Sequence, residues 1–479
     1  MDHTEIALSA LCTKLGERVN TSAVKLYEAS YDGLKVKGSP QAIIEIQDEH
    51  EVGEVLKLAN EFSIPVTSRG AGSSLTGGAT PYKGGWVLDL SRLTSLDVDP
   101  DNMLVCCGPG VVVGELQSKV AEFGLFYPPD PSSKKFCTIG GNIACNAGGL
   151  RCVKYGVTRD YVLALSGYLP TGQFVRWGRA TRKFATGYNL RDLWIGSEGT
   201  LGVVTEITLR LILDVPERLT FLAAFTDDQA ALAAPLAISK LGVRPSILEY
   251  MDQWTIDCLQ KYVGEEVFTG VQPRPMLLIE LDGTKESLEP ESLLIEKWLQ
   301  EEAIEFRKAN NEDEAEKLWE VRRQGSSSMK KLATTKLNED IVVPLDRQIE
   351  LVKFVDSLRT NYQLNIGVFG HCGDGNLHVN FMYDEDNEEE TGRAVEALHQ
   401  LMEKVVSLDG AISGEHGVGL AKTPFVRNQF NQAEWNTMLA VKKTLDPKGI
   451  LNPGKIFDVF KPWEEKKEKV ILSWERTDH

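Results

Sequence analysis

The spacing of apolar and polar residues changes along the chain and predicts a mixture of helices and strands. Helical spacing appears at residues 4–15, 49–62 and 112–123. Short apolar runs typical of strands lie at residues 42–46, 66–69, 86–90, 104–107, 162–170, 173–177 and 203–213. The alternation of the two patterns predicts α/β organisation over this part of the chain.

The pattern changes after residues 214–218, which we interpret as a domain boundary. Beyond it come a strand, a helix and a strand at 220–225, 227–241 and 246–251, and then the same order at 276–281, 286–299 and 304–307. Two such units in series suggest an antiparallel, ferredoxin-like sheet covered by helices. We therefore expect an N-terminal helical segment (1–37), a first domain (38–216), a second domain (217–458) and a charged tail (459–479).

Bulk properties narrow the class of protein. A chain of 479 residues with 42% hydrophobic and 25% charged residues is typical of a soluble protein with more than one core. The net charge of −17 argues against nucleic acid or an anionic membrane as the primary partner. No apolar run reaches the roughly 20 residues of a membrane helix, and the first residues lack a basic targeting pattern. We expect a cytoplasmic protein.

The eight cysteines are scattered and form no C-x-x-C pair. This spacing fits neither a zinc ribbon nor an iron–sulfur ligand set, so reduced packing thiols are the favoured interpretation. If the protein moves electrons, it does so without an iron–sulfur relay of its own.

Residues 67–78 (TSRGAGSSLTGG) follow a short apolar run and contain four glycines among small residues. Such a loop can turn consecutive N–H groups toward one concavity and bind a phosphate, with Arg69 adding charge. The alternative is a simple tight turn. Neither the dinucleotide pattern G-x-G-x-x-G nor a P-loop is present.

Two further glycine-rich regions follow, at 127–149 and 196–202. The first contains so much Gly, Pro, Asn and Ser that we expect loop structure throughout residues 138–149. Three such clusters in one domain suggest a long ligand lying along the backbone, although an irregular domain with many turns would show the same composition.

The candidate chemistry lies near the C-terminus, in residues 369–381 (FGHCGDGNLHVNF) and 413–419 (SGEHGVG). Strand alternation places Asn376, His378 and Asn380 on one face. His371, His378 and Glu415 would supply two nitrogen ligands and one oxygen ligand to zinc, manganese or iron. His416, beside Glu415, would then be free to act as a base. Each histidine taken alone could equally be a hydrogen-bonded structural residue.

Arg322 and Arg323 are candidates for binding a substrate carboxylate, because a guanidinium group matches a carboxylate bidentately. The alternative is that both are surface charges on a helix. Lys336 has the same two interpretations.

In this order along the chain, the motifs resemble the flavin-dependent 2-hydroxyacid dehydrogenases of the vanillyl-alcohol-oxidase fold. This family includes the flavin subunit of glycolate oxidase and D-lactate dehydrogenases. The resemblance is carried by residues 67–78, 128–133, 138–149, 154–156, 196–202, 370–378, 414–419 and 452–455. It implies an α+β fold with a vanillyl-alcohol-oxidase-type FAD-binding domain, a ferredoxin-like substrate (cap) domain and a C-terminal helical segment that contacts the flavin.

The resemblance also implies an FAD site, with the pyrophosphate at the first glycine-rich loop. The residues that it assigns to FAD are Arg69, Gly70, Ala71, Gly72, Ser73, Ser74, Pro129, Asp130, Ser132, Gly140, Gly141, Asn142, Asn146, Gly148, Glu198, Gly202, Val203 and Asn452. The second glycine-rich region and residues 198–203 would surround the ribose and adenine, and Asn452 would lie in a loop that approaches the flavin ring. Ser73 stands where covalently flavinylated relatives have histidine, so we expect non-covalent FAD.

For the chemistry, the resemblance implies a divalent metal on His371, His378 and Glu415, with His416 as the catalytic base and hydride passing from the substrate to flavin N5. Arg322 would bind the substrate carboxylate, and Ser326, Asn380 and Lys336 would be further substrate contacts. The lysine that D-2-hydroxyglutarate dehydrogenases use aligns with Asn338, two residues from Lys336. This departure favours a small 2-hydroxy acid of the glycolate or D-lactate type.

The electron acceptor implied is an iron–sulfur partner subunit, an electron-transfer flavoprotein or a quinone, and a homodimer remains open. Three alternatives share the fold or the motifs: a D-2-hydroxyglutarate-type dehydrogenase, a flavin-dependent ether-lipid synthase-like transferase, and a non-catalytic FAD-binding subunit. The transferase should show no net electron transfer to a dye, and the non-catalytic subunit should show no substrate-driven flavin bleaching.

Overall fold

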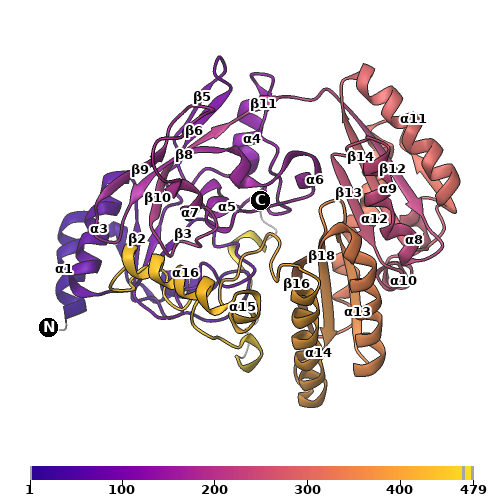
Figure 1. Cartoon of the computed structure of the whole chain (residues 1–479). Helices are drawn as coiled ribbons and strands as arrows, with labels where there is room; N and C mark the ends of the chain where they lie inside the picture. Colours follow the sequence, from indigo (N-terminus) through magenta and orange to yellow (C-terminus); the bar gives the residue numbers. More distant parts are fainter. Residues whose placement is uncertain (1–2, 466–469, 476–479) are drawn as a thin grey trace. The chain divides into compact units, whose positions relative to one another are not determined.

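The computed structural model describes residues 3–465 and 470–475, and it divides the chain into two compact units (Figure 1). Unit 1 consists of Met1–Gly148, Val157–Asp214 and Glu415–His479, and unit 2 of Gly149–Gly156 and Val215–Gly414. The division therefore differs from the domains expected from the sequence in two places. The short segment Gly149–Gly156 belongs to unit 2, and the residues after Gly414 return to unit 1.

Unit 1 contains a four-stranded sheet in the order β1-β2-β4-β3, formed by Val19–Asn20, Ala42–Glu45, Trp86–Asp89 and Val66–Arg69. β2, β4 and β3 are parallel. The helices α1 (His3–Leu15), α2 (Ala23–Ala29) and α3 (Glu49–Phe62) belong to the same region. The amphipathic α3 begins at a capping box formed by Asp48 and Glu51, and its apolar face packs into the same buried cluster as the sheet.

The second sheet of unit 1 is antiparallel and has the order β5-β6-β10-β8-β9. Its strands are Leu96–Asp99, Leu104–Cys107, Val203–Arg210, Val162–Tyr168 and Phe174–Gly178. A small pair, β7 (Leu125–Phe126) with β11 (Ile212–Leu213), and the helices α4 (Val113–Ala121) and α7 (Leu190–Trp194) complete this part of the unit.

The loop expected over residues 138–149 is wrong in part, because α5 (Ile139–Cys145) is a helix. The hydroxyl of Thr138 caps it by accepting the N–H of Gly141, and Asn146 ends it in a left-handed conformation. Ile139 and Ile143, four residues apart, are both fully buried. Capping and burial therefore outweigh the low helix propensity of the two glycines.

The C-terminal segment completes the first sheet of unit 1. The carbonyl of Ile450 accepts the N–H of Val66 at 2.8 Å, and Asn452 donates its N–H to the carbonyl of Val66 at 2.8 Å. These bonds add residues 450–452 to the edge of β3. The yellow helices α15 (Thr423–Gln429) and α16 (Gln432–Leu445) precede this connection (Figure 1).

Unit 2 is built on a seven-stranded antiparallel sheet in the order β15-β12-β14-β13-β17-β18-β16. Its strands are Glu305–Lys308, Glu217–Ala224, Met276–Gly283, Ile247–Met251, Asn365–His371, Asn376–Tyr383 and Thr335–Val342. The first four have the order of a ferredoxin-like sheet, as the sequence predicts. Three further strands extend the sheet from β13.

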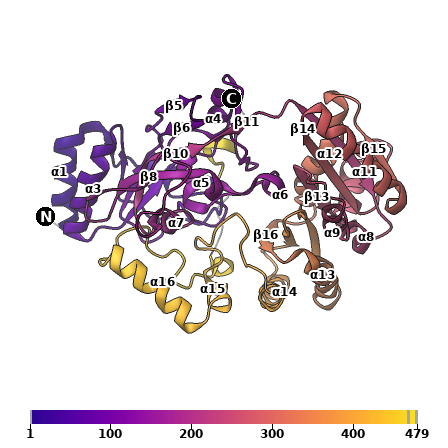
Figure 2. The same ribbon diagram turned by 45° about the horizontal axis from the view of Figure 1, so that its top comes forward.

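Helices cover both faces of this sheet. α11 (Lys285–Glu302) packs on β12, β14 and β15. α10 (Gln253–Tyr262) and α12 (Glu312–Met329) pack on each other and share a buried cluster with side chains of β12 and β14. α13 (Gln348–Tyr362) and α14 (Glu388–Ser407) lie side by side in Figure 2 and pack against β17 and β18. The helix expected at 227–241 is two helices, α8 (Asp228–Leu232) and α9 (Ala234–Lys240), with Pro235 in the first turn of α9.

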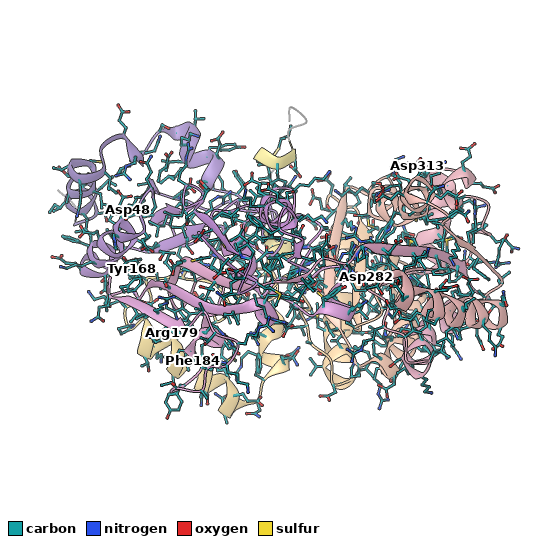
Figure 3. All side chains as sticks on the ribbon, turned by 90° about the horizontal axis from the view of Figure 1, so that it is seen from above. Asp48, Tyr168, Arg179, Phe184, Asp282 and Asp313 are labelled. Carbon is teal, nitrogen blue, oxygen red and sulfur yellow. The ribbon has the colours of Figure 1, made fainter. Side chains whose placement is uncertain are left out.

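A buried carboxylate holds Gly149–Gly156 in unit 2. This segment contains α6 (Cys152–Tyr155), and Asp282, labelled in Figure 3, is fully buried on β14. Its carboxylate accepts hydrogen bonds from Lys154 at 2.6 Å and Tyr155 at 2.9 Å, and it lies 3.4 Å from a guanidinium nitrogen of Arg151. Lys154 and Tyr155 therefore depend on one desolvated acid, whereas Arg151 also pairs with Glu280 at 2.9 Å.

We expect Asp282→Asn to lower the free energy of unfolding by about 3 kcal/mol, because it leaves the largely buried Lys154 without its carboxylate partner. Urea unfolding monitored by circular dichroism measures the change. Asp313→Asn, at an exposed position in the first turn of α12, is the matched control and should change stability by less than about 1 kcal/mol. Equal midpoints for the two variants would contradict the assigned role.

The predicted charged tail is described only in part. Glu464 ends a short 3-10 turn (Pro462–Glu464), whereas residues 466–469 lie outside the described residues.

No helix among the described residues is both long enough and apolar enough to cross a membrane.

Candidate functional site

A cavity of about 320 Å³ lies within unit 1, between the glycine-rich loop after β3 and the helix α5. This volume is in the range of ligand pockets, roughly 300–1,000 Å³. Most of its lining residues lie within the segments 68–79, 131–148 and 194–204, and the others are Leu90, Pro109, Glu415, His416 and Trp474. The three glycine-rich regions of the sequence therefore meet at one cavity.

The glycines of the first loop are required for its shape. Gly72 has φ of +69°, a left-handed conformation that favours glycine. A Cβ at Gly70 would clash with the hydroxyl of Thr138, so the backbone of the loop lies directly against the side chain at the start of α5. This close approach leaves main-chain groups on the cavity wall.

Arg69 gives the loop a partly buried positive charge. One of its guanidinium nitrogens donates to the carbonyl of Ala79 at 3.3 Å. Burial lowers the pKa of Arg69, and Asp32 and Asp89 oppose this effect. Asp32 is itself fully buried and accepts the N–H groups of Leu34 and Ala79. A cation beside a glycine-rich loop is suited to bind a phosphate group.

The same loop is bonded to the turn that carries His416. The hydroxyl of Thr76 donates to the carbonyl of His416 at 3.1 Å. The carboxylate of Glu198 accepts the N–H groups of Val418 at 2.8 Å and Gly419 at 2.7 Å. Residues separated by more than two hundred positions therefore hold Glu415 and His416 at the cavity wall, where the Glu415 carboxylate lies 3.7 Å from Nε2 of His416.

The buried position of Glu198 has an electrostatic consequence. Burial raises the pKa of its carboxyl group above the usual range, while the two N–H donors and Lys455 act in the opposite direction. Lys455 is also buried, and burial lowers its pKa to about 8. Glu198 thus positions the turn that carries His416, although the resemblance assigns it to the ribose and adenine.

Most of the cofactor residues predicted from the sequence line the cavity. They are Arg69, Gly70, Ala71, Gly72, Ser73, Ser74, Ser132, Gly140, Gly141, Asn142, Gly148, Glu198 and Gly202. Pro129, Asp130, Asn146, Val203 and Asn452 are not among the lining residues. Asn452 instead supports the wall, because its amide donates to the carbonyls of Gly78 at 2.8 Å and Glu198 at 2.7 Å.

Val204, Phe136 and Trp474 are among the lining residues that were missed from the sequence. Val204 lines the cavity while its neighbour Val203 is buried, which strand alternation on β10 could have indicated. Phe136 and Trp474 carry no signal in the sequence, because isolated aromatic residues are common in cores and on surfaces.

The second group of candidate residues lies in unit 2, on the sheet face covered by α10 and α12. β13, β17, β18 and β16 each point alternate side chains to this face, and the registers place Glu249 opposite His371 and Asn338 opposite Asn380. The rings of His371 and His378 lie 5.3 Å apart between centroids, nearly perpendicular. Strand alternation thus brings together most of the residues predicted from the sequence.

Glu249, which the sequence analysis missed, orients two of these residues. It is fully buried and accepts hydrogen bonds from Nδ1 of His371 and from Nε of Arg322, the latter at 2.6 Å. Burial would raise the pKa of Glu249, but its interactions with His371 and Arg322 lower it to about 2. An acidic residue inside an otherwise apolar strand is the signal that could have identified it.

Arg322 is bound on one side only. Its guanidinium carbon lies 4.4 Å from the ring centroid of Phe369, and only Nε makes a hydrogen bond to a described residue. Its two terminal nitrogens remain available for a ligand. The neighbouring Arg323 is different, because it is half exposed and paired with Glu316 and Glu320. The structure thus separates the two arginines that the sequence left equivalent.

Lys336 adds a second cation beside Phe369. Its Nζ lies 5.4 Å from the ring centroid and donates to the hydroxyl of Ser326 at 2.7 Å. It forms no ion pair with a carboxylate of the described residues. Burial, together with the nearby charges of Lys330 and Arg322, lowers the pKa of Lys336 to about 7.

Asn380 is fully buried beside these cations. Its amide nitrogen donates to the carbonyls of His378 at 2.9 Å and Gly367 at 3.3 Å. Its Oδ1, like that of Asn338, has no hydrogen-bond partner among the described residues. A buried acceptor without a partner is expected to be satisfied by a ligand or by water.

The lowered pKa of Lys336 has a consequence for stability. Between pH 7 and the usual lysine pKa of 10.5, the unfolded chain binds a proton that the folded chain lacks, so this group makes stability rise with pH. Below pH 7 the folded protein carries a poorly solvated charge. We expect Lys336→Met to be more stable than the original protein by about 2 kcal/mol at pH 6, with a smaller difference at pH 9.

Urea unfolding at the two pH values measures this difference. Lys317→Met, at an exposed position on the same helix as Arg322, should change stability little at either pH. A difference that grows with pH would contradict the account of Lys336.

Comparisons with known proteins agree with this arrangement of parts. Residues 40–178 match the FAD binding domain, and residues 216–456 match the C-terminal domain of FAD linked oxidases. The chain is 38% identical to glycolate oxidase subunit GlcD of Bacillus subtilis over 431 residues, which cover 89% of this chain and 91% of that protein. The chain belongs to the FAD-linked oxidase family. It is a flavin-dependent oxidoreductase related to glycolate oxidase and D-lactate dehydrogenase.

Another relative of this FAD-linked oxidase is a D-lactate dehydrogenase of Anaerostipes hadrus, 35% identical over 435 residues, with coverage of 88% of this chain and 90% of that protein. Among solved structures, p-cresol methylhydroxylase with substrate bound has a TM-score of 0.78 at 16% identity, covering 95% of this chain and 97% of that one. Alkyldihydroxyacetonephosphate synthase has a TM-score of 0.71 at 18% identity, covering 94% and 84%. These similarities confirm the predicted vanillyl-alcohol-oxidase-type fold.

The cavity of this FAD-linked oxidase suits the cofactor. The glycine-rich wall at Gly70 and Gly72 and the partly buried charge of Arg69 suit a ligand that contains a pyrophosphate. The eight cysteines are all free, so the described residues contain no disulfide.

Proposed function

We propose that the chain oxidises a small 2-hydroxy acid of the glycolate or D-lactate type to the corresponding 2-oxo acid. The observation that carries this proposal is the cationic group around Phe369, in which Arg322 keeps two nitrogens for a carboxylate. The names of the relatives, glycolate oxidase and D-lactate dehydrogenase, point to the same class of substrate.

In this proposal Arg322 binds the substrate carboxylate bidentately, and Glu249 fixes the orientation of the guanidinium group. Oδ1 of Asn380 accepts a hydrogen bond from the substrate, and Ser326 and Lys336 bound the same site. His416, held at the cavity wall through Thr76 and Glu198, takes the proton of the α-hydroxyl group as a general base. Bound FAD supplies the two-electron oxidant.

We further propose that His371 and His378 bind a divalent metal, zinc, manganese or iron, with Glu415 as the third ligand assigned from the sequence. The contact of Glu249 with Nδ1 of His371 supports this, because metal-binding histidines are commonly oriented by a carboxylate on the other ring nitrogen. A metal in this set would make a bound hydroxyl group more acidic. Metal analysis of the purified protein, compared with His378→Ala, tests the assignment.

The FAD is proposed to be non-covalent. Ser73, at the loop position where covalently flavinylated relatives carry histidine, lines the cavity and offers no nitrogen for such a bond. Acid precipitation should release the flavin into the supernatant. Retention of the colour in the protein pellet would contradict this part of the proposal.

The electron acceptor is proposed to be an iron–sulfur partner subunit, an electron-transfer flavoprotein or a quinone. An artificial dye can replace it in a turnover assay. We expect dye reduction with at least one member of a panel containing glycolate and the D and L forms of lactate and 2-hydroxyglutarate. No dye reduction by FAD-loaded protein would favour a transferase related in fold to the ether-lipid synthase.

One observation favours a second candidate substrate. Lys336 lies on the same sheet face as Asn338 and has no carboxylate partner among the described residues, so it could bind a second acidic group of a dicarboxylic 2-hydroxy acid. The same panel separates the two candidates, because 2-hydroxyglutarate would then have a much lower KM than lactate.

A further inference from the structure

The last described residues return to the wall of the FAD cavity. We call residues 470–475 the C-terminal strap. Trp474 in this segment lines the cavity and stacks on Phe136, with ring centroids 5.6 Å apart and planes within 7° of parallel. The match to the family ends at residue 456, so the strap lies beyond the part of the chain that defines the family. The sequence predicted a charged tail over residues 459–479 and no role for this segment.

Several contacts within unit 1 attach the strap. The ammonium group of Lys35 donates to the carbonyl of Val470 at 3.1 Å and to both carboxylate oxygens of Glu475, at 2.9 and 3.0 Å. Leu472 is 5% exposed, and its N–H donates to the carboxylate of Glu475 at 3.0 Å. The strap is therefore anchored at both ends and in the middle, and these anchors present Trp474 to the cavity.

The cavity wall around Trp474 is suited to a flat aromatic group. Phe136 and Trp474 form a parallel, laterally offset pair, because their centroid separation exceeds the thickness of two stacked rings. The same stretch of lining includes Pro131, Ser132 and Ser133, directly beside Phe136 in the chain. Arg69, the charged group suited to bind a phosphate, comes from a different lining segment, the glycine-rich loop 67–78.

FAD offers two flat ring systems to such a wall, the adenine and the isoalloxazine. His416 and Glu415 must face the isoalloxazine if they take part in the chemistry, and they are held by Thr76 and Glu198. Trp474 is held by a different set of contacts, to Phe136 and Lys35. Because the turn of His416 and Trp474 are held by different contacts, we assign the isoalloxazine to the former and the adenine to Trp474.

We propose that the C-terminal strap is part of the FAD site and that Trp474 stacks against the adenine ring. The inference rests on FAD occupying the cavity and not on the identity of the substrate. The Lys35–Glu475 pair is about one third exposed, and exposed ion pairs contribute little to stability. The strap can therefore open for FAD to enter, and its closure slows the release of FAD.

The test is titration of the apoprotein with FAD and with FMN, which lacks the adenine. Loss of one aromatic stacking partner of a base weakens binding by roughly 10- to 100-fold. We expect Trp474→Ala, and a chain ending at Glu465, to raise the Kd of FAD by at least about 10-fold and to leave the Kd of FMN within about twofold. Trp474→Phe should restore most of the affinity for FAD.

Ile471→Ala is the matched control, because Ile471 belongs to the strap but is 66% exposed and does not line the cavity. It should leave both affinities unchanged, and equal unfolding midpoints will show that all variants fold. An unchanged Kd of FAD in Trp474→Ala, or an equal loss of FMN, would overturn the proposal. Failure of every 2-hydroxy acid to react with the FAD-loaded protein would leave this inference standing and would affect only the proposed function.

Discussion

Replacing His416 with alanine is expected to leave FAD bound and to slow flavin reduction by the substrate by about 10²- to 10⁴-fold. The side chain is the proposed base for the α-hydroxyl proton, and it is one of the two acid–base groups of the 415–419 turn at the cavity wall. The contact with Thr76 is made by the main-chain carbonyl of His416, so an alanine should preserve the turn. Stopped-flow absorbance under anaerobic conditions measures the rate.

His50→Ala provides the control for this variant. His50, on α3, also belongs to unit 1, but it contacts the hydroxyl of Tyr168 on β8 and does not line the cavity. Its replacement should leave the rate of flavin reduction within about twofold, since it takes no part in proton transfer. If His416→Ala reduced its flavin as fast as the His50 variant, another group would have to be the base.

Arg322→Lys is expected to lower kcat/KM by about 100-fold, with most of the change in KM. Lysine keeps the positive charge beside Glu249 but has a single nitrogen, so it cannot hold Glu249 and also bind a carboxylate bidentately. Steady-state dye reduction with the preferred 2-hydroxy acid gives the two constants separately.

Arg323→Lys is the matched control for this variant. Arg323 is on the same helix, one residue away, and its charge is satisfied by Glu316 and Glu320 at the surface. We expect its kcat/KM to stay within about twofold of the original protein. Similar losses in the two variants would mean that Arg322 acts through helix stability and not through the carboxylate of the substrate.

The hydrophobic pattern predicted many of the regular elements of unit 1 and the first four strands of the unit 2 sheet. The predicted ranges 49–62 and 66–69 coincide with α3 and β3, and the predicted ferredoxin-like order is present in the first four strands of unit 2. The helix α5 escaped prediction because its stability comes from the Thr138 cap and from buried Ile139 and Ile143, which a glycine-rich composition conceals.

The site could be predicted only where strand periodicity applied. The alternation of Asn376, His378 and Asn380 placed three side chains on one face, and the structure has the same register. The partners of these residues come from distant segments, so the sequence could not show that Glu249 orients Arg322 or that Glu198 holds the turn of His416. Such contacts depend on tertiary packing and not on local spacing.

The return of the C-terminal segment to unit 1 was also beyond local patterns. It depends on main-chain hydrogen bonds between Val66 and residues 450–452, which have no signature in side-chain chemistry. For the same reason the strap and Trp474 were overlooked, because a short tail with one tryptophan looks like any exposed terminus.

Anaerobic mixing of the FAD-loaded protein with a panel of D- and L-2-hydroxy acids tests the central claim most directly. The flavin absorbance should bleach with at least one member, and one 2-oxo acid should form for each flavin reduced. Bleaching without formation of a 2-oxo acid, or no bleaching by any member of the panel with FAD bound, would contradict the proposed oxidation.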